Sequence, residues 1–479
     1  MADADYDGTV TQEVVERDPN LDWPTWKILM INLTMCGVGF CFSVYCVINQ
    51  PYLEQLNLGP STSSIVQVLG PVFGFFVQPV VGYLTDRSRS KYGARKLYVT
   101  IGCVLTALSQ LWCGFAQKAA ATMYTEDLTA GSKYLGFVQG WAIVGIVLFN
   151  IAVNVEMGSF HSLIAVNVPK ESQGKGASGQ ALMGGISNTI SNVIMLVLYL
   201  TSPIDTTPGV PPNTHVMSWV KLYPIMAPIA CVVTLVSFIP AFILVKETQL
   251  VEAKASSNVF KELYIEFRGM NKIFYFAMIV LFVDWLTFTP NQQFLGKIFS
   301  VDVTNMCAIA QNVVVMIFSP FLAGLVKKFG ERNMQFFAAG TNVLAMCILF
   351  AGAFPGGAAV NHMAVQIFCQ AIIGFLNACM NSIHLIIVGV LAPQKSKGLY
   401  AGIFNCTIVV AQAVDSAIIS GVSALVGNSA SLYVSFVTSI LLVLVSPLIV
   451  KRTDREVSMD DRVAAQKEEP EIRTSNPLD

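Results

Sequence analysis

The stretch VQPVVGYLTDRSRSKYGARK, from Val77 to Lys96, changes from apolar to basic at its middle. Its first half is apolar and rich in β-branched residues. Its second half holds one acid, Asp86, among five bases, and glycines stand in both halves at Gly82 and Gly93. An apolar segment that runs into a basic turn is typical of a membrane-spanning helix that ends on the cytoplasmic side.

The composition extends this reading to the whole chain. Of the 479 residues, 54% are hydrophobic and only 12% are charged, whereas soluble domains are usually about 25% charged. A bilayer-spanning helix needs roughly 20 mainly apolar residues, and such segments recur from Trp26 to Val450. The predicted class is therefore an all-α, multi-spanning membrane protein whose surroundings are the lipid bilayer. The first 22 residues are acidic and polar and do not resemble a cleaved signal peptide.

Charge and motifs argue against several other classes. The net charge of −1 gives no bulk attraction to nucleic acid. The eleven cysteines are scattered, mostly in apolar runs, and no pair has metal-ligand spacing. The histidines lack HExxH-type spacing, and no phosphate-cradling loop is visible. Glu156 and His161 are five residues apart and fall on different helix faces, so we expect no enzyme, no cofactor and no metal.

Twelve apolar segments are predicted to span the membrane, with ends uncertain by several residues. They cover about 26–49, 63–85, 97–116, 136–166, 177–200, 216–245, 273–294, 303–326, 334–354, 362–391, 399–426 and 429–450. With the N-terminus inside, the outer loops and outer helix ends hold 4 of the 29 Lys and Arg residues, which leaves 25 inside. This asymmetry predicts that both termini are cytoplasmic, in the plasma membrane or an endomembrane.

The two halves of the chain repeat a pattern. GYLTDRSRSKYGARK follows the second segment, and GLVKKFGERN, from Gly324 to Asn333, follows the eighth. Each has a glycine at a helix end, then bases, then a second glycine with a base close behind. Two repeated six-helix bundles are typical of transporters. The predicted organisation is tails at 1–25 and 451–479, bundles at 26–245 and 273–450, and a cytoplasmic linker at 246–272.

The loop G-x-x-x-D-R between the second and third segments resembles the signature of the major facilitator superfamily. The longer stretch GPVFGFFVQPVVGYLTDRSRSKYGARK resembles the sucrose–proton symporters of the glycoside–pentoside–hexuronide cation symporter family and their animal proton-associated sugar transporter relatives. NQPYL, the pair Asp284-Trp285 and GLYAGIFNCTIVVAQ agree in the same order. The resemblance implies the major facilitator fold and alternating-access transport of sucrose or a related glycoside with protons. We expect a monomer.

The basic loop is predicted to be a cytoplasmic gate. Gly82 allows two helices to approach closely, and Asp86 can pair with Arg87 or Arg95. With Gly93, these residues would hold the inner side shut and release it when the halves rock. The alternative is that the bases only set the orientation of the chain.

Polar stripes on two spanning helices predict a substrate site. At about 100° per residue, the members of each stripe fall within about 40° of its first residue. Polar groups inside spanning helices usually face a cavity or a partner, and amides offer the donors and acceptors that sugar hydroxyls need. The alternative is hydrogen bonding between helices. The stripes occupy corresponding helices of the two halves and consist of Asn150, Asn154 and His161, and of Asn377, Asn381 and His384.

Four further side chains are predicted to contact the substrate. Trp285 and Phe288 follow Asp284 and can stack on the apolar faces of a sugar ring, although aromatics in such helices often only pack. Asn405 and Gln412 are seven residues apart and share one face of the eleventh segment.

The residues that would couple transport to protons differ from those of the resembling family. The resemblance implies an aspartate and an arginine on the fourth segment, but Asn150 and His161 stand there. Histidine titrates near neutral pH whereas asparagine does not. The predicted proton carriers are Asp284 first, then Glu156, with His161 as a further candidate. Each acid has the alternative of a structural ion pair.

Other functions stay open. The loss of both family charges favours a passive sugar facilitator as one alternative. A carrier of another small polar solute, such as an amino acid, is a second, because His161 and Asp284 can supply fixed charges of both signs. A sugar sensor is a third, although sensors tend to have longer cytoplasmic extensions than these tails.

Overall fold

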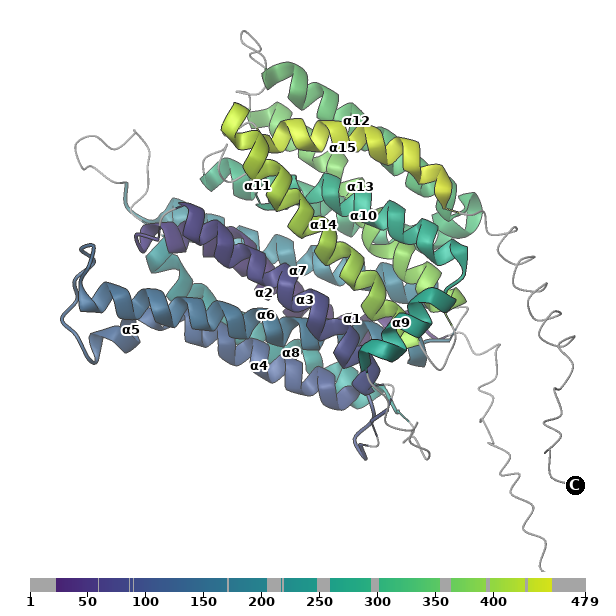
Figure 1. Cartoon of the computed structure of the whole chain (residues 1–479), viewed down its shortest axis with the longest axis horizontal. Coiled ribbons are helices and arrows are strands. Elements are labelled where there is room, and N and C mark those ends of the chain that lie inside the picture. Colours follow the sequence, from purple (N-terminus) through teal and green to yellow (C-terminus); the bar gives the residue numbers. More distant parts are fainter. Residues whose placement is uncertain are drawn as a thin grey trace, which may run out of the picture.

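The computed structural model describes residues 23–58, 60–85, 87–88, 90–169, 172–204, 217, 219–247, 259–293, 301–353, 363–392, 397–426 and 430–449. Within these residues the chain forms a bundle of long helices (Figure 1). The helices are α1 Thr25–Asn32, α2 Thr34–Gln55, α3 Pro60–Thr85, α4 Lys96–Gly114, α5 Ala116–Ala121, α6 Lys133–Asn167, α7 Gln173–Thr201, α8 Trp219–Leu244, α9 Val259–Gly269, α10 Lys272–Gln293, α11 Val301–Phe329, α12 Glu331–Ala353, α13 Met363–Leu391, α14 Lys397–Val426, α15 Ala430–Val445 and η4 Ser446–Leu448.

Most of these helices cross the membrane. Among the described residues, eleven segments are long and apolar enough to do so: α1 with α2 as one, then α4, α6, α7, α8 and α10 to α15. The helix α3 takes the place of the remaining expected crossing, with a shorter apolar stretch over Val72–Thr85. Large apolar side chains cover the outside of the bundle, as Ile243 does at 66% exposure. The chain is therefore an all-α, multi-pass membrane protein, as predicted.

The first crossing is interrupted at one residue, which the apolar pattern did not predict. The helix α1 ends at Asn32 and α2 begins at Thr34, with Leu33 between them. Thr34 Oγ1 donates to the carbonyl of Ile31 at 3.3 Å. A hydroxyl that bonds a carbonyl of the preceding turn competes with the helical hydrogen bonds.

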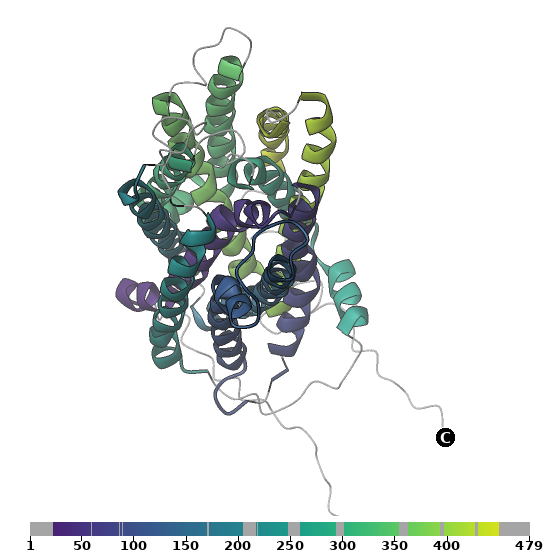
Figure 2. The same cartoon turned by 90° about the vertical axis from the view of Figure 1, so that its left-hand side faces the viewer.

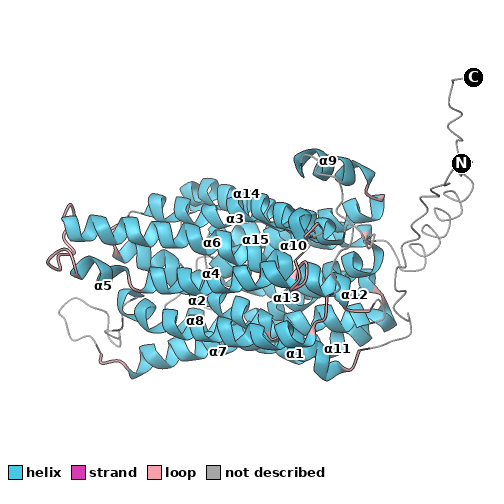
Figure 3. Cartoon of the chain, turned by 90° about the horizontal axis from the view of Figure 1, so that it is seen from below, coloured by secondary structure: helices cyan, strands magenta, loops and turns pink. Residues whose placement is uncertain are grey.

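The polar linker contains an additional helix. Residues 246–272 were predicted to be a linker, and the helix α9 lies within them. Its apolar residues are separated by charged ones, which gives one apolar face; Tyr264 and Ile265 on this helix are exposed. The helix α9 contacts α3 and lies at the opposite end of the bundle from α5 (Figure 3). We call this end of the bundle the α9 end.

The packing of the first half recurs in the second, helix for helix. In the first half, α4 packs on α6 and α8; in the second half, the corresponding helix α12 packs on α13 and α15. Likewise α2 packs on α7 and α8, as α10 packs on α14 and α15. The two halves lie one above the other in Figures 1 and 2, with α10 to α15 in green and yellow above the purple and blue first half. The prediction of two six-helix repeats is confirmed.

Two symmetric helix pairs join the halves: α3 with α14, and α7 with α11. Near the α9 end the halves approach closely at two glycines, Gly402 in the α3–α14 pair and Gly389 of α13, which faces α7. A Cβ atom on Gly402 would lie 3.0 Å from Pro79 Cα, and one on Gly389 would lie 2.5 Å from Gln173 Oε1. The halves are therefore in tight contact at the α9 end in this structure.

Candidate functional site

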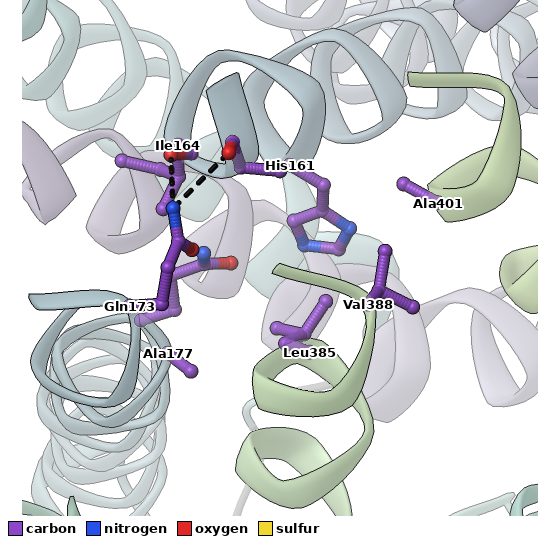
Figure 4. A pocket seen from close by; sticks show the side chains of 9 residues that line it. His161, Ile164, Gln173, Ala177, Leu385, Val388 and Ala401 are labelled. Carbon is purple, nitrogen blue, oxygen red and sulfur yellow. Dashed lines mark hydrogen bonds between the residues drawn. The ribbon is translucent and has the colours of Figure 1, made fainter. Parts of the chain in front are cut away.

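A small pocket lies between the two halves, near the α9 end. Its free volume is about 10 Å³, close to the minimum that holds one water molecule. Figure 4 shows the His161 ring pointing toward Leu385 and Val388 of the other half. We call it the central pocket; four helices line it, mainly through His161 of α6, Gln173 and Gln180 of α7, Leu385 and Val388 of α13, and Ala401 of α14.

Two polar side chains of this pocket can serve a ligand. His161 is half-buried, and Gln180 is buried with its Oε1 atom lacking a hydrogen-bond partner. Gln173 has a structural task instead, because its Nε2 donates to the carbonyls of Val168 and Ala165 at 2.7 and 3.1 Å. These bonds fasten the end of α6 to the start of α7. Of the predicted residues, the central pocket thus contains His161.

The asparagines of the first stripe bond to neighbouring helices of their own half. Asn150 Nδ2 donates to Tyr45 Oη of α2 at 3.2 Å. Asn154 Oδ1 accepts from Gln78 Nε2 of α3 at 2.8 Å, and its Nδ2 donates to the carbonyl of Asn150. Both asparagines are buried. The stripe exists as predicted, and in this closed arrangement its amides join α6 to α2 and α3.

The second stripe divides into two parts. Asn381 Nδ2 donates to the carbonyl of Asn377 at 2.9 Å, and Asn381 is half-buried. His384 turns to α10, where its Nε2 lies 3.7 Å from Asp284 Oδ2. Asp284 Oδ1 accepts from Gln335 Nε2 of α12 at 2.7 Å. His384 and Asp284 are therefore buried partners within the second half.

The two aromatic side chains predicted to contact the substrate differ in burial. Phe288 is 1% exposed and packs inside the second half with Met346 of α12 and Ile373 of α13. Its ring has no access to a cavity between the halves in this structure, because the apolar interior of the second half surrounds it. Trp285 is half-buried and meets Phe288 edge-on at 5.9 Å between ring centroids.

Two predicted substrate contacts on α14 and two carboxylates inside the bundle remain to be described. On α14, Asn405 is buried and Gln412 is half-buried. Glu156 is 0% exposed, and its backbone presses on Gly102 of α4, inside the first half. Asp415 is also 0% exposed. Neither carboxylate has a hydrogen-bond partner for its oxygens, and neither lines the central pocket.

Arg95, one of the predicted gate residues, contacts Ser162 and Glu247 of the first half. Arg95 Nε donates to Ser162 Oγ of α6 at 2.8 Å, and its Nη1 lies 3.7 Å from Glu247 Oε1. Glu247 Oε2 also accepts from the backbone N–H groups of Arg95 and Lys96, each at 2.9 Å. These contacts join the start of α4 to α6 and to the chain after α8, within the first half.

Three of the other predicted gate residues belong to the described part of the chain. Gly93 has φ of +107°, and a Cβ atom there would collide with the Glu247 side chain, so the turn requires glycine. The Arg87 guanidinium lies 3.8 Å from the centre of the Tyr83 ring. Gly82 is buried in α3. Asp86 lies outside the described residues.

Several functional candidates were missed by sequence reasoning. Gln78 stands alone among apolar neighbours, and Gln180 and Gln335 also lie within spanning helices, where an amide is itself a signal. Glu247 follows α8 directly, where the basic loop of the same half could have suggested an acidic partner. Tyr45 of α2 is a further residue of this kind, because its hydroxyl accepts a hydrogen bond from Asn150.

The fold, the repeat and the pocket between the halves define a carrier of two bundles, and comparison with known families agrees. The family model of the Major Facilitator Superfamily matches residues 31–283 and 274–474. The chain belongs to this superfamily. It is a transporter rather than an enzyme.

Individual relatives share a smaller part of the chain. The General alpha-glucoside permease of Schizosaccharomyces pombe is 28% identical over 35% of this chain and 30% of its own length. The Sucrose transport protein SUT2 of Oryza sativa subsp. japonica is 29% identical over 30% and 28%. The structure of the proton:xylose symporter XylE from E. coli matches with a TM-score of 0.63 and 15% identity, over 88% of this chain and 94% of that one. The match to each of the two curated relatives, the permease and SUT2, thus covers about a third of that relative's length.

Proposed function

We propose that the protein is a secondary carrier of a sugar, sucrose or a related disaccharide or glycoside, that moves its substrate with protons by alternating access. The observation that carries this proposal is the central pocket. It lies where the two halves of a major facilitator fold meet, and its polar groups, His161 and Gln180, can bond hydroxyls. The names of the relatives supply the substrate class.

The volume of the pocket fits a closed state of such a cycle. About 10 Å³ excludes a sugar ring, so a substrate can enter only when the halves move apart. Separation would uncover the helix faces that now meet between the bundles. We propose that His161, Asn154, Asn381 and Trp285 then contact the sugar, with Asn405 and Gln412 on α14. We propose that both termini and the α9 end face the cytoplasm.

The test is uptake of radiolabelled sucrose into liposomes that contain the purified protein, with and without an inward proton gradient. Accumulation that needs the gradient is the expected result. Equilibration without accumulation would identify a passive facilitator, the alternative that Asn150 favours because an amide stands where the resembling family has an acid. No movement of sucrose would overturn the proposed substrate and call for other sugars and amino acids.

A pocket variant ties the uptake to this site. Gln180→Leu keeps the size of the side chain but removes its hydrogen-bonding groups, and it is expected to reduce uptake about tenfold or more. The matched control is Asn333→Ala on the exposed start of α12, which should transport as the wild type does. Equal uptake by Gln180→Leu and the wild type would move the substrate site elsewhere.

A further inference from the structure

A carboxylate and an imidazole face one another in the interior of the second half. Asp284 Oδ2 of α10 lies 3.7 Å from His384 Nε2 of α13, and the two side chains are 0% and 4% exposed. The other carboxylate oxygen, Oδ1, accepts a hydrogen bond from Gln335 Nε2. Neither Oδ2 nor Nε2 has a hydrogen-bond partner. Two unsatisfied polar atoms therefore point at each other in a place without water access.

The other ring nitrogen fixes where the proton of the neutral ring lies. His384 Nδ1 is 3.0 Å from the carbonyl oxygen of Met380. A carbonyl only accepts hydrogen bonds, so Nδ1 carries the hydrogen. The neutral ring then turns a bare Nε2 lone pair toward the bare Oδ2 of Asp284. One proton placed between these two acceptors would satisfy both atoms.

Among the residues that the structure describes, the surrounding helices offer no other positive charge near the pair. Of the described side chains on α13, Cys379 and His384 are the titratable ones near Asp284; α12 presents the Gln335 amide and α15 the Ser435 hydroxyl. Tyr400 of α14 packs on Phe274 of α10, and Phe274 precedes Asp284 by ten residues. Asp415 lies fifteen residues after Tyr400 on α14. On α2, Tyr45 is bonded to Asn150. The described basic side chains of this half stand at the α9 end and are Lys272, Lys327, Lys328 and Arg332.

Charge balance therefore depends on His384. Without a further proton, the pair has a net charge of −1 and no fixed cation, which is costly in a buried site. With one proton it becomes an imidazolium beside a carboxylate, and the net charge is zero. The repeat gives a neutral counterpart: in the first half, α2 and α6 meet through Tyr45 Oη and Asn150 Nδ2, neither of which exchanges a proton near neutral pH.

The pair is also connected to the place where the halves meet. Val388 lies one turn after His384 on nearly the same face of α13 and lines the central pocket. The helix α13 packs on α7 across the halves. Movement of the halves must therefore disturb the packing that keeps water from the pair.

We propose that Asp284 and His384 together bind the proton that is moved with the substrate, between Oδ2 and Nε2. This inference rests on the proposed function, in which sugar and proton move together. The proton enters from the side of higher proton concentration and leaves to water when the opposite side opens. Gln335 is a positioning residue, because it holds the carboxylate through Oδ1.

The first test needs no sugar. Nitrogen-15 NMR of the four histidines in liposomes reports which ring nitrogens carry a proton, and His384→Gln assigns the signal. In the wild type, Nε2 of His384 should be bare at alkaline pH and protonated at mildly acidic pH. In Asp284→Asn, the amide can donate to Nε2, and protonation in the same range should disappear. Identical titration in Asp284→Asn, or no titration of Nε2 in the wild type, would overturn the proposal.

The second test uses transport in the same liposomes. Asp284→Asn should retain measurable exchange of labelled for unlabelled sucrose, which shows that it is folded, yet fail to accumulate sucrose on a proton gradient. Asp415→Asn, which changes another buried acid of this half, should still accumulate. Gradient-driven accumulation by Asp284→Asn would sink the proposal. Wild-type protein that only equilibrates sucrose would refute the coupled transport itself, and the NMR titration would then still decide whether the pair binds a proton.

Discussion

At the scale of single residues, buried amides in this bundle act as connections between helices. Asn192 Nδ2 of α7 donates to Ser43 Oγ of α2 at 3.0 Å, and Asn342 Nδ2 of α12 donates to Ser439 Oγ of α15 at 2.7 Å. Each pair joins two helices of one half. Because a polar group that loses its partner inside the membrane finds no water, such bonds select one register of the helices.

The bond between Gln78 and Asn154 gives a measurable case. Asn154→Ala leaves Gln78 Nε2 buried without its acceptor, which should lower the free energy of unfolding by about 1–3 kcal/mol. The double variant Asn154→Ala, Gln78→Leu removes both groups and should cost less than the sum of the single changes. Thermal unfolding of the purified variants measures this. A wild-type midpoint for Asn154→Ala would show that the bond contributes no stability.

The sequence could predict the faces of these residues but not their partners. The helical period places Asn150, Asn154 and His161 on one stripe, and the structure keeps them there. Which group each one meets depends on the helices packed alongside, and no spacing within α6 encodes Tyr45 or Gln78. The same limit applies to His384, whose partner Asp284 lies 100 residues earlier in the chain.

At the scale of elements, the start of α4 is fastened by an acid that lies outside its own sequence. Glu247 accepts the backbone N–H groups of Arg95 and Lys96 and contacts the Arg95 guanidinium. The first N–H groups of a helix lack partners within the helix, and a carboxylate there also meets the positive end of the helix dipole. Lys96 Nζ adds a bond to the carbonyl of Val245 at 2.9 Å.

Removal of the Glu247 carboxylate should weaken the attachment of the start of α4 to the chain after α8. Glu247→Ala is expected to lower the free energy of unfolding by about 1–2 kcal/mol, and faster hydrogen exchange should be confined to the amides at the start of α4. Glu247→Gln keeps an acceptor oxygen and should show a smaller change. Lys246→Ala, at the exposed neighbouring position, is the control. Unchanged exchange in Glu247→Ala would mean that the carboxylate does not hold the helix start.

Element positions were largely predictable because hydrophobicity sets the length of a membrane crossing. The segment predicted at 273–294 is α10, Lys272–Gln293, and that predicted at 216–245 is α8, Trp219–Leu244. The interruption at Leu33 and the helix α9 were not predicted. Both depend on local hydrogen bonding and on an amphipathic pattern, which a search for apolar runs does not detect.

At the scale of the whole molecule, the repeat was predictable and the conformational state was not. The loops GYLTDRSRSKYGARK and GLVKKFGERN placed two equivalent bundles in the chain. Whether these bundles meet at one end or the other depends on small differences in contact energy between alternative packings of the same surfaces. The close approach of Gly402 to Pro79 and of Gly389 to Gln173 identifies the contacts that favour the arrangement seen here.

Gly402 allows this balance to be shifted. Gly402→Leu places a side chain against Pro79 and the carbonyl of Gln78, where even a Cβ atom would lie 3.0 and 3.2 Å away. The overlap should destabilise the arrangement that is closed at the α9 end by about 1–3 kcal/mol. In an open arrangement this overlap is absent. The ratio of the open to the closed population should therefore rise about 5- to 150-fold.

Spin labels on Leu84 of α3 and Phe329 of α11, exposed side chains in different halves, report the separation of the halves at this end. A population with a longer distance should appear in Gly402→Leu and remain minor in the wild type. Gly340→Leu is the control, because a Cβ atom at Gly340 meets nothing within 4 Å. If the distance distribution of Gly402→Leu matched that of the control, the close helix approach would not determine closure. A longer distance would show that one glycine contact between α3 and α14 helps to select the state in which the central pocket is closed.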